Sequence, residues 1–170
     1  MSDERQGEAL WPALDNLPAG SGVVVRHYSL ARAERRTLID RVREIARPRG
    51  LVLIVAGPPD LATACGADGF HERSERIGPP ELLRTMSAHD AAEIETAERV
   101  GADLVFVSPV FATRSHTEAP ALGRAKFTSL VGQTDLPVVA LGGMDAERAH
   151  SLAGTGMHGW AAIGALTPTN

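Results

Sequence analysis

The chain has 170 residues, of which 44% are hydrophobic and 22% are charged, and this predicts one globular domain over residues 1–170. Its formal net charge is −4 and it has no long basic run, which argues against nucleic acid as a partner. The polar N-terminus does not resemble a signal peptide, and no apolar run could span a membrane, so we expect a cytoplasmic protein without membrane contact.

Seven short apolar segments rich in β-branched residues are predicted to be strands. They cover residues 23–28, 51–56, 69–72, 85–89, 104–110, 138–141 and 160–163. Helical patterns lie before and between them. A first helix is expected around residues 10–17, and Leu38, Ile39, Val42 and Ile45 form one helical face. Two further helices are expected to begin after the capping residues Asp90 and Asp145.

The tripeptide Gly-Ala-Asp occurs twice, at residues 66–68 and 101–103, and a predicted strand follows each copy. Glycine commonly closes a helix because it tolerates the left-handed turn. The copies lie 35 residues apart, about the length of one strand–helix unit. The repeat therefore indicates a chain built of successive βα units.

Strict alternation of strands and helices predicts an α/β fold, either an open doubly wound sheet or a TIM (β/α)8-type barrel. A barrel has eight strands, and this chain has seven recognisable ones. We expect a barrel that lacks most of strand 1 at its N-terminus, with residues 1–5 as the tail of that strand. Such a barrel would expose a sheet edge, which favours a homo-oligomer.

Residues that follow the predicted strands are rich in hydrogen-bond donors and poor in carboxylates. Arg26, Ser87, Thr113, Arg114 and Ser115 suit an anionic ligand, and parallel α/β enzymes place their sites at these strand ends. The pair Gly142-Gly143, with Gly164 after the last strand, predicts backbone N–H groups facing a phosphate. A tight turn is the alternative explanation for the glycine pair.

Histidines also follow several strands. His116 could reach a substrate from its polar loop, whereas His27, His71 and His89 could equally serve in packing or hydrogen bonding. No histidine or cysteine spacing indicates a metal site. Arginines at positions 32, 35, 36, 41 and 43 alternate with acidic residues and are interpreted as a solvated helix face.

Three segments together resemble the superfamily of thiamine-phosphate synthases and TenI-type thiazole tautomerases. Residues 85–89, Thr-Met-Ser-Ala-His, resemble its fifth strand, and residues 101–116 resemble its sixth strand and the following loop. Residues 137–144, Pro-Val-Val-Ala-Leu-Gly-Gly-Met, resemble its seventh strand. Ser2-Asp3 resembles the end of its first strand.

The resemblance implies a thiamine biosynthesis enzyme that condenses an aminopyrimidine diphosphate with thiazole phosphate, giving thiamine phosphate and diphosphate with the help of Mg²⁺. It implies a phosphorylated small-molecule substrate. By the same resemblance, the catalytic candidates are Arg26, Ser87, His89 and His116. The candidates for binding substrate or phosphate are Thr113, Ser115, Gly142, Gly143, Ile163 and Gly164.

The sequence departs from the family pattern at the positions implied to bind metal and substrate. The strand-two glutamine and lysine are replaced by Val24 and Tyr28. The implied magnesium carboxylates fall at residues 56–57, which are Ala-Gly, and at residues 75–76, which are Glu-Arg, so no metal ligand is assigned. A tautomerase that uses His89 or His116, and a non-catalytic relative that binds a phosphorylated ligand, are therefore alternatives. The tautomerase's own histidine falls at Pro109.

Overall fold

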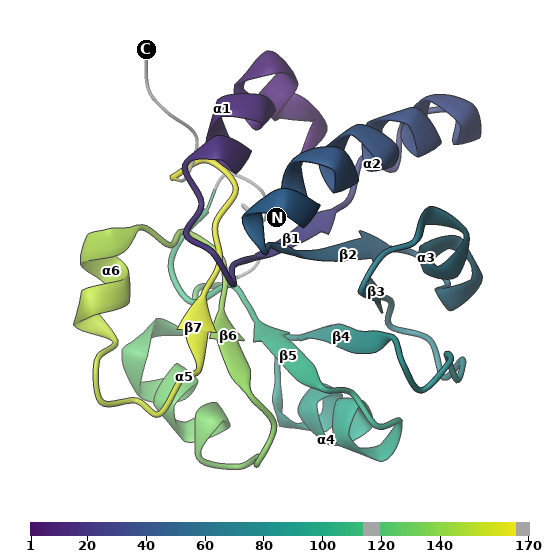
Figure 1. The fold of residues 1–170 in the computed structure, drawn as a ribbon. Helices are drawn as coiled ribbons and strands as arrows, with labels where there is room; N and C mark the ends of the chain where they lie inside the picture. The colour runs from purple at the N-terminus through teal and green to yellow at the C-terminus, as the bar shows by residue number, and fades with distance from the viewer. Residues whose placement is uncertain (114–119, 166–170) are drawn as a thin grey trace. The chain divides into compact units, whose positions relative to one another are not determined.

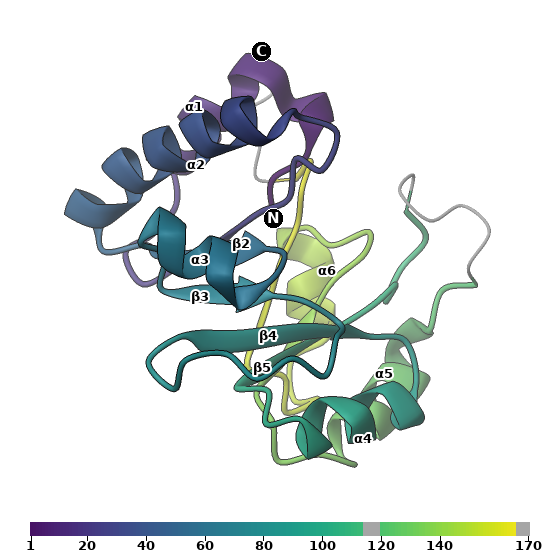
Figure 2. The ribbon, with the colours of Figure 1, turned by 90° about the vertical axis from the view of Figure 1, so that its right-hand side faces the viewer.

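The computed structural model describes residues 1–113 and 120–165, which form two compact units. Unit 1 contains Met1–Leu83 and unit 2 contains Arg84–Ala165. Unit 1 runs from purple to dark teal in Figure 1, and unit 2 runs from teal to yellow; Figure 2 gives the second view. None of the helices in the described ranges has the length and hydrophobicity needed to cross a bilayer.

Unit 1 consists of three strands with helices before and between them. In chain order its elements are η1 (Glu4–Ala9), α1 (Leu10–Asp15), β1 (Gly22–Val25), α2 (Arg32–Ala46), η2 (Arg47–Arg49), β2 (Val52–Ala56), α3 (Pro59–Cys65) and β3 (Gly69–His71). The strands are parallel, with Val25 opposite Val55 and Val55 opposite Phe70. Ser2 donates its N–H to Val24 O at 2.8 Å, so the N-terminal segment lies beside β1.

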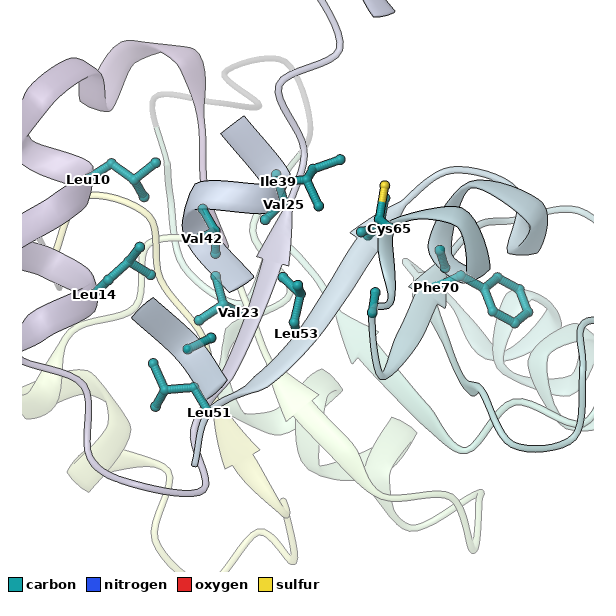
Figure 3. Packing of buried hydrophobic residues seen from close by; sticks show 14 residues of the cluster. Leu10, Leu14, Val23, Val25, Ile39, Val42, Leu51, Leu53, Cys65 and Phe70 are labelled. Atoms are coloured by element: carbon teal, nitrogen blue, oxygen red, sulfur yellow. The ribbon is translucent and has the colours of Figure 1, made fainter. Parts of the chain in front are cut away.

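The core of unit 1 lies between the apolar stripe of α2 and the sheet (Figure 3). Ile39, Val42 and Ala46 recur at helical spacing and are buried, as the sequence predicts. They form one cluster with Val25 and Leu53 from neighbouring strands. Burial of this stripe fixes which side of α2 faces the sheet.

Unit 2 repeats the same alternation. Its elements are β4 (Leu83–Ala88), which starts at the unit boundary, α4 (Ala91–Arg99), β5 (Leu104–Val107), α5 (Gly123–Val131), β6 (Val138–Ala140), α6 (Ala146–Ser151) and β7 (Gly159–Trp160). The register aligns Ala88 with Val107, Val107 with Ala140, and Ala140 with Trp160. The carboxyl ends of these parallel strands therefore leave the sheet in one row.

Each of the seven predicted strand segments overlaps an observed strand, although β7 shares only Trp160 with its predicted segment. Apart from β2, which ends at Ala56 as predicted, the observed strands end earlier than predicted; β1 ends at Val25 and β5 at Val107. Asp90 and Asp145 cap α4 and α6 by accepting from the third backbone N–H that follows them, as predicted. Helix α5 has no counterpart among the predicted elements.

The Gly-Ala-Asp repeat has one structural role in both units. Gly66 and Gly101 adopt left-handed φ angles of 60° and 70° after α3 and α4. Asp68 accepts from Leu53 N at 2.7 Å through its side chain and donates its own N–H to Leu53 O at 2.8 Å. We call this two-way contact an aspartate clamp. It joins the residue before a strand to the preceding strand of the sheet.

The second clamp has the same geometry. Asp103 accepts from Arg84 N at 2.7 Å through its side chain and donates its N–H to Arg84 O at 2.8 Å. Both clamped partners, Leu53 and Arg84, are buried residues near the start of their strands. Because a buried N–H needs an acceptor, each clamp satisfies a backbone group that water cannot reach.

Removing either clamp should destabilise the fold. We expect Asp68→Ala and Asp103→Ala each to lower the free energy of unfolding by about 1–2 kcal/mol, because a buried backbone N–H loses its acceptor. Asp68→Asn keeps an amide oxygen and should lose less. The exposed Asp135 makes no such contact, so Asp135→Ala should change stability by less than about 0.5 kcal/mol. Urea unfolding measures all four, and an equal loss in Asp135→Ala would contradict the assignment.

Candidate functional site

The carboxyl ends of β1, β2 and β3 carry the first set of candidate residues. These strands are parallel neighbours, so Arg26 after β1, Gly57 after β2 and His71 at the end of β3 leave unit 1 at one edge. Arg26 is half-buried, and its backbone N–H donates to Ser2 Oγ at 3.1 Å. The edge therefore presents a cationic side chain beside a histidine.

Arg35 reaches the same edge from α2. Its Nη2 donates to Ala56 O and to Val25 O, the last residues of β2 and β1. Its Nε is buried and has no acceptor among the described residues. The ring of Tyr28 is near both arginines, with its centroid 5.3 Å from Arg35 Cζ and 6.0 Å from Arg26 Cζ. We refer to Arg26 and Arg35 as the arginine pair.

Placing Arg35 at this edge corrects the interpretation of α2 as a solvated arginine face. Arg32 and Arg41 are exposed, as expected for such a face. Arg35 and Arg43 instead donate to backbone carbonyls, Arg43 to Cys65 O at 2.5 Å. Arg35 lies four residues before the buried Ile39, so the sheet-facing stripe of the helix extends to it. The four-residue spacing between Arg35 and Ile39 therefore indicates, from the sequence alone, that Arg35 can face the sheet.

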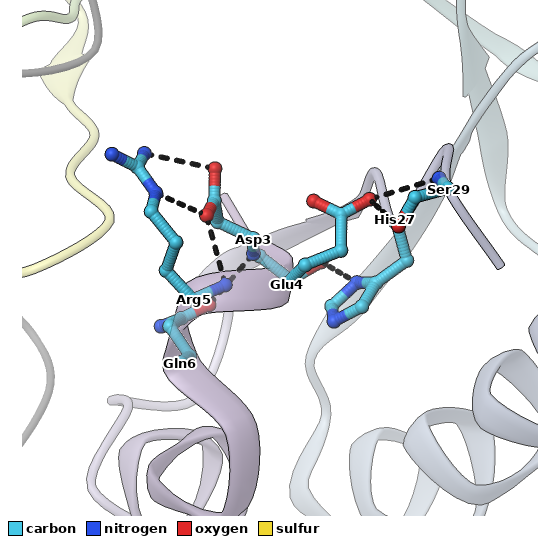
Figure 4. Close-up of polar contacts among 7 residues, drawn as sticks. Asp3, Glu4, Arg5, Gln6, His27 and Ser29 are labelled. Carbon is cyan, nitrogen blue, oxygen red and sulfur yellow. Dashed lines mark hydrogen bonds and ion pairs between the residues drawn. The ribbon is translucent and has the colours of Figure 1, made fainter.

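The N-terminal segment is tied to the loop after β1 by a polar network (Figure 4). Ser2 Oγ lies 3.0 Å from His27 Nδ1, and Glu4 Oε1 accepts from Ser29 N and Ser29 Oγ at 3.1 and 3.2 Å. Burial lowers the pKa of His27, which favours its neutral form. His27 therefore has the hydrogen-bonding role that the sequence left open for it.

His71 is held in its neutral form at this edge. Burial, the charge of Arg26 and the amino terminus lower the pKa of His71 to about 4. At neutral pH His71 therefore adds no positive charge to the strand ends of unit 1, whereas both members of the arginine pair do.

In unit 2, His89 joins the ends of β4 and β5. Its Nδ1 lies 2.5 Å from Ser108 O, and since a carbonyl can only accept, we assign the ring proton to Nδ1. The backbone N–H of His89 donates to Glu93 Oε2 at 2.8 Å. These contacts give His89 a defined tautomer and orientation. Ser87 lies inside β4 and is half-buried.

The glycine pair after β6 is required by the chain path. Gly142 and Gly143 have φ angles of 89° and 64°. A Cβ on Gly142 would lie 2.7 Å from Pro109 Cα, and one on Gly143 would lie 2.5 Å from Ala112 O. The turn requires glycine at both positions, because the loop after β5 leaves no space for side chains here.

The turn also orients its N–H groups. Leu141 O accepts from Val110 N at 2.9 Å, and Gly142 O accepts from Phe111 N at 3.0 Å. In a trans peptide the N–H points away from the carbonyl of the preceding residue, so Gly142 N–H and Gly143 N–H point away from these partners. Among the described residues, neither Gly142 N nor Gly143 N donates a hydrogen bond. They are available to an anion, as the phosphate hypothesis requires.

The remaining candidate residues lie on loops of unit 2. Thr113 follows β5, whereas Ile163 and Gly164 follow β7, the strand next to β6. Ser115 and His116 lie outside the described residues. In the parts of the chain that the structure describes, no three His, Cys, Asp or Glu side chains come together in a way that could hold a metal ion.

A family model described as thiamine monophosphate synthase matches residues 7–166. The chain belongs to this family. A thiamine-phosphate synthase of Methanoculleus marisnigri is 34% identical over 165 residues, which cover 90% of this chain and 78% of that protein. A protein described as putative thiamine-phosphate synthase 2 from Aquifex aeolicus is 30% identical, covering 83% of this chain and 80% of its own.

Solved structures show the fold of the family. Thiamine phosphate pyrophosphorylase from Pyrococcus furiosus matches with a TM-score of 0.78 and 24% identity over 95% of this chain and 82% of its own. A 3-hexulose-6-phosphate synthase matches with a TM-score of 0.65 and 14% identity over 95% of this chain and 86% of its own. The predicted α/β fold of TIM-barrel type and the predicted superfamily are thereby confirmed.

The effect of the close approach at Gly142 on stability can be compared with the effect at a glycine that has no atoms near its missing Cβ. We expect Gly142→Ala to lower the free energy of unfolding by about 2–4 kcal/mol, from left-handed strain and overpacking against Pro109. Gly154 has a similar φ of 79° but nothing near its missing Cβ, so Gly154→Ala should cost about 1 kcal/mol. Urea unfolding of both variants isolates the contact, and equal losses would disprove it.

His71 should make the protein sensitive to mild acid. Above pH 6.5 it is neutral in both the folded and the unfolded state. Between pH 6.5 and about 4 the unfolded chain binds a proton that the folded site excludes, so stability falls by up to about 3 kcal/mol. The free energy of unfolding, measured by urea unfolding at several pH values, should depend less on pH in this range for His71→Asn. Replacing the exposed His150 by Asn should not reduce the dependence. Parallel curves for wild type and His71→Asn would refute the assignment.

Proposed function

We propose that this chain is a thiamine-phosphate synthase. It would join an aminopyrimidine diphosphate to thiazole phosphate. The bond between the pyrimidine methylene carbon and the diphosphate oxygen breaks, and the thiazole nitrogen uses its lone pair to form the new carbon–nitrogen bond. Diphosphate leaves with the bonding electrons, and the thiazole ring becomes a thiazolium cation. The family match over residues 7–166 is the observation that carries this proposal.

The reaction suits a site made of donors. No proton is transferred in the bond exchange, so the main demand is to stabilise negative charge on the leaving diphosphate. In unit 1, Arg26 is the cation proposed to contact that group. In unit 2, Ser87 in β4 and His89 after it are proposed as catalytic residues by the family resemblance. The N–H groups of Gly142 and Gly143 suit the phosphate of the thiazole. Thr113, Ser115, His116, Ile163 and Gly164 complete the proposed set of substrate contacts.

The described residues do not fit the divalent cation that the resemblance implies. Ala56 and Gly57 offer no carboxylate at the end of β2. Glu72, after β3, accepts from Ser74 Oγ at 2.6 Å, and no group of three or more His, Cys, Asp or Glu side chains within the described ranges could hold a metal. We therefore assign no step of the reaction to a metal ion.

A non-catalytic relative that binds a phosphorylated ligand is the second candidate. The same shortage of grouped carboxylates favours it, because a binder needs the donors but not the machinery for diphosphate departure. A tautomerase has less support, because the position that the resemblance implies for the tautomerase's own histidine is Pro109 in this chain.

A synthase assay separates the two candidates. Purified protein supplied with both substrates should form thiamine phosphate and diphosphate in equal amounts, detected by chromatography. Arg26→Met should lower kcat/KM at least about 50-fold, because a charge on the leaving group is lost. Replacing the exposed Arg32 by Met should have no effect. Tight binding of thiazole phosphate without any product, in buffers with and without Mg²⁺, would instead identify a binder.

A further inference from the structure

Arg148, in α6, reaches back to the glycine turn that precedes this helix. Its Nη1 donates to Gly143 O, and its backbone N–H donates to Asp145 Oδ1 at 2.8 Å. The carbonyls of residues 141 and 142 accept from backbone N–H groups of the loop after β5, whereas the carbonyl of Gly143 accepts from this side chain. The orientation of the peptide between Gly143 and Met144 therefore depends on Arg148.

The orientation of this peptide decides where the N–H of Met144 points. Because the N–H of a trans peptide points away from the carbonyl of the preceding residue, Met144 N–H points away from Arg148. Within residues 1–113 and 120–165, Met144 N donates no hydrogen bond, like Gly142 N and Gly143 N. Met144 is a buried residue, and the N–H of a buried residue is rarely left without an acceptor. Three successive N–H groups of the turn can therefore donate to a ligand, and such groups commonly bind anions.

The guanidinium of Arg148 also lies near the loop after β5. Its Cζ is 5.4 Å from the centroid of the Phe111 ring, a distance at which a cation is attracted to an aromatic face. Phe111 is the residue whose N–H donates to Gly142 O at 3.0 Å. The two neighbouring carbonyls of the glycine pair are thus held by two residues that also contact each other.

Asp145 brings a negative charge to the same turn. Its carboxylate caps α6, and it would repel an anion bound at the neighbouring N–H groups. Arg148 Nε lies 3.7 Å from Asp145 Oδ2 and offsets that charge. Both side chains are about half exposed, so the ion pair itself adds little to stability. Its effect is expected on ligand binding.

We infer that Arg148 is a positioning residue for phosphate binding at the turn after β6. It holds the Gly143–Met144 peptide so that Met144 N–H donates to the phosphate together with the two glycine N–H groups, and it offsets the charge of Asp145. The guanidinium acts through the turn and does not itself bind the phosphate. That the ligand is thiazole phosphate rests on the proposed function, whereas the positioning of the turn does not.

Titration of the isotope-labelled chain with inorganic phosphate, followed by NMR, tests the inference. In the wild type the amide signals of residues 142–144 should shift as phosphate binds. Arg148→Met should raise the Kd at least about fivefold, and at saturation the Met144 signal should shift less than half as far, because its peptide is no longer held. Arg124→Met is the matched control. Arg124 is exposed and donates to two carbonyls at the other end of α6, so its loss should change the Kd less than twofold.

Three results would overturn the inference. The first is a wild-type chain whose amide signals at residues 142–144 do not respond to phosphate, and the second is an Arg148→Met variant that binds as tightly as wild type. The third is weaker binding with an unchanged Met144 shift at saturation, which would make Arg148 a direct ligand. Arg148→Lys keeps a charge and a donor and should bind within about threefold of wild type. Circular dichroism checks folding, and if Arg148→Met is unfolded, the same criteria apply to Arg148→Gln.

The synthase assay reads the proposed function separately. Arg148→Met should raise KM for thiazole phosphate at least about fivefold and lower kcat less than about twofold, because the turn holds the phosphate equally before and during the reaction. A lower kcat with unchanged KM would contradict the assigned role. Phosphate binding at the turn without any product would leave the inference standing and count against the synthase.

Discussion

The aspartate clamp is the contact on which both units depend. Between a helix and the next strand, the chain must end the helix, reverse its direction and enter the sheet in register. The tripeptide Gly-Ala-Asp accomplishes all three. Glycine permits the left-handed turn, alanine is buried beneath it, and aspartate ties its own backbone and side chain to the neighbouring strand. Because Asp68 and Asp103 repeat the same distances, the register of each following strand is set by the same local chemistry. The positions of the residues at the other ends of those strands, including His71 and His89, depend on it.

Much of this fold can be read from the sequence, for identifiable reasons. Runs of β-branched residues and helix caps mark the seven strands and helices α4 and α6, since these signals act over a few neighbouring residues. Several strand ends were predicted too far along the chain, because residues such as Val110 are compatible with a strand, but the backbone partner of Val110, Leu141, lies in the loop after β6. Helix α5 escaped prediction because Leu122 provides no side-chain cap and Gly123 opens it with a left-handed φ of 68°.

In the candidate site too, some features depend on neighbouring residues and others on residues that are distant in the sequence. The sequence identified Gly142 and Gly143 as candidates because they follow a predicted strand. Glycine is required there because the loop after β5 lies against them, and the sequence alone does not place that loop. Arg35 was missed because its role depends on two carbonyls from different strands, contributed by residues 25 and 56. A long side chain on a helix can face water or the sheet, and only the extended apolar stripe of α2 favours the second. Electrostatic features are therefore less visible in the sequence than packing.

The tight contact between the turn after β6 and the loop after β5 also constrains how such proteins can diverge. Pro109 and Ala112 occupy the volume that side chains at positions 142 and 143 would need, so neither segment can change alone. A larger residue in the turn would be accepted only after the facing loop had moved or changed length. We therefore expect the two loops to change together during evolution. A change in substrate preference that involves one loop should be accompanied by replacements in the other.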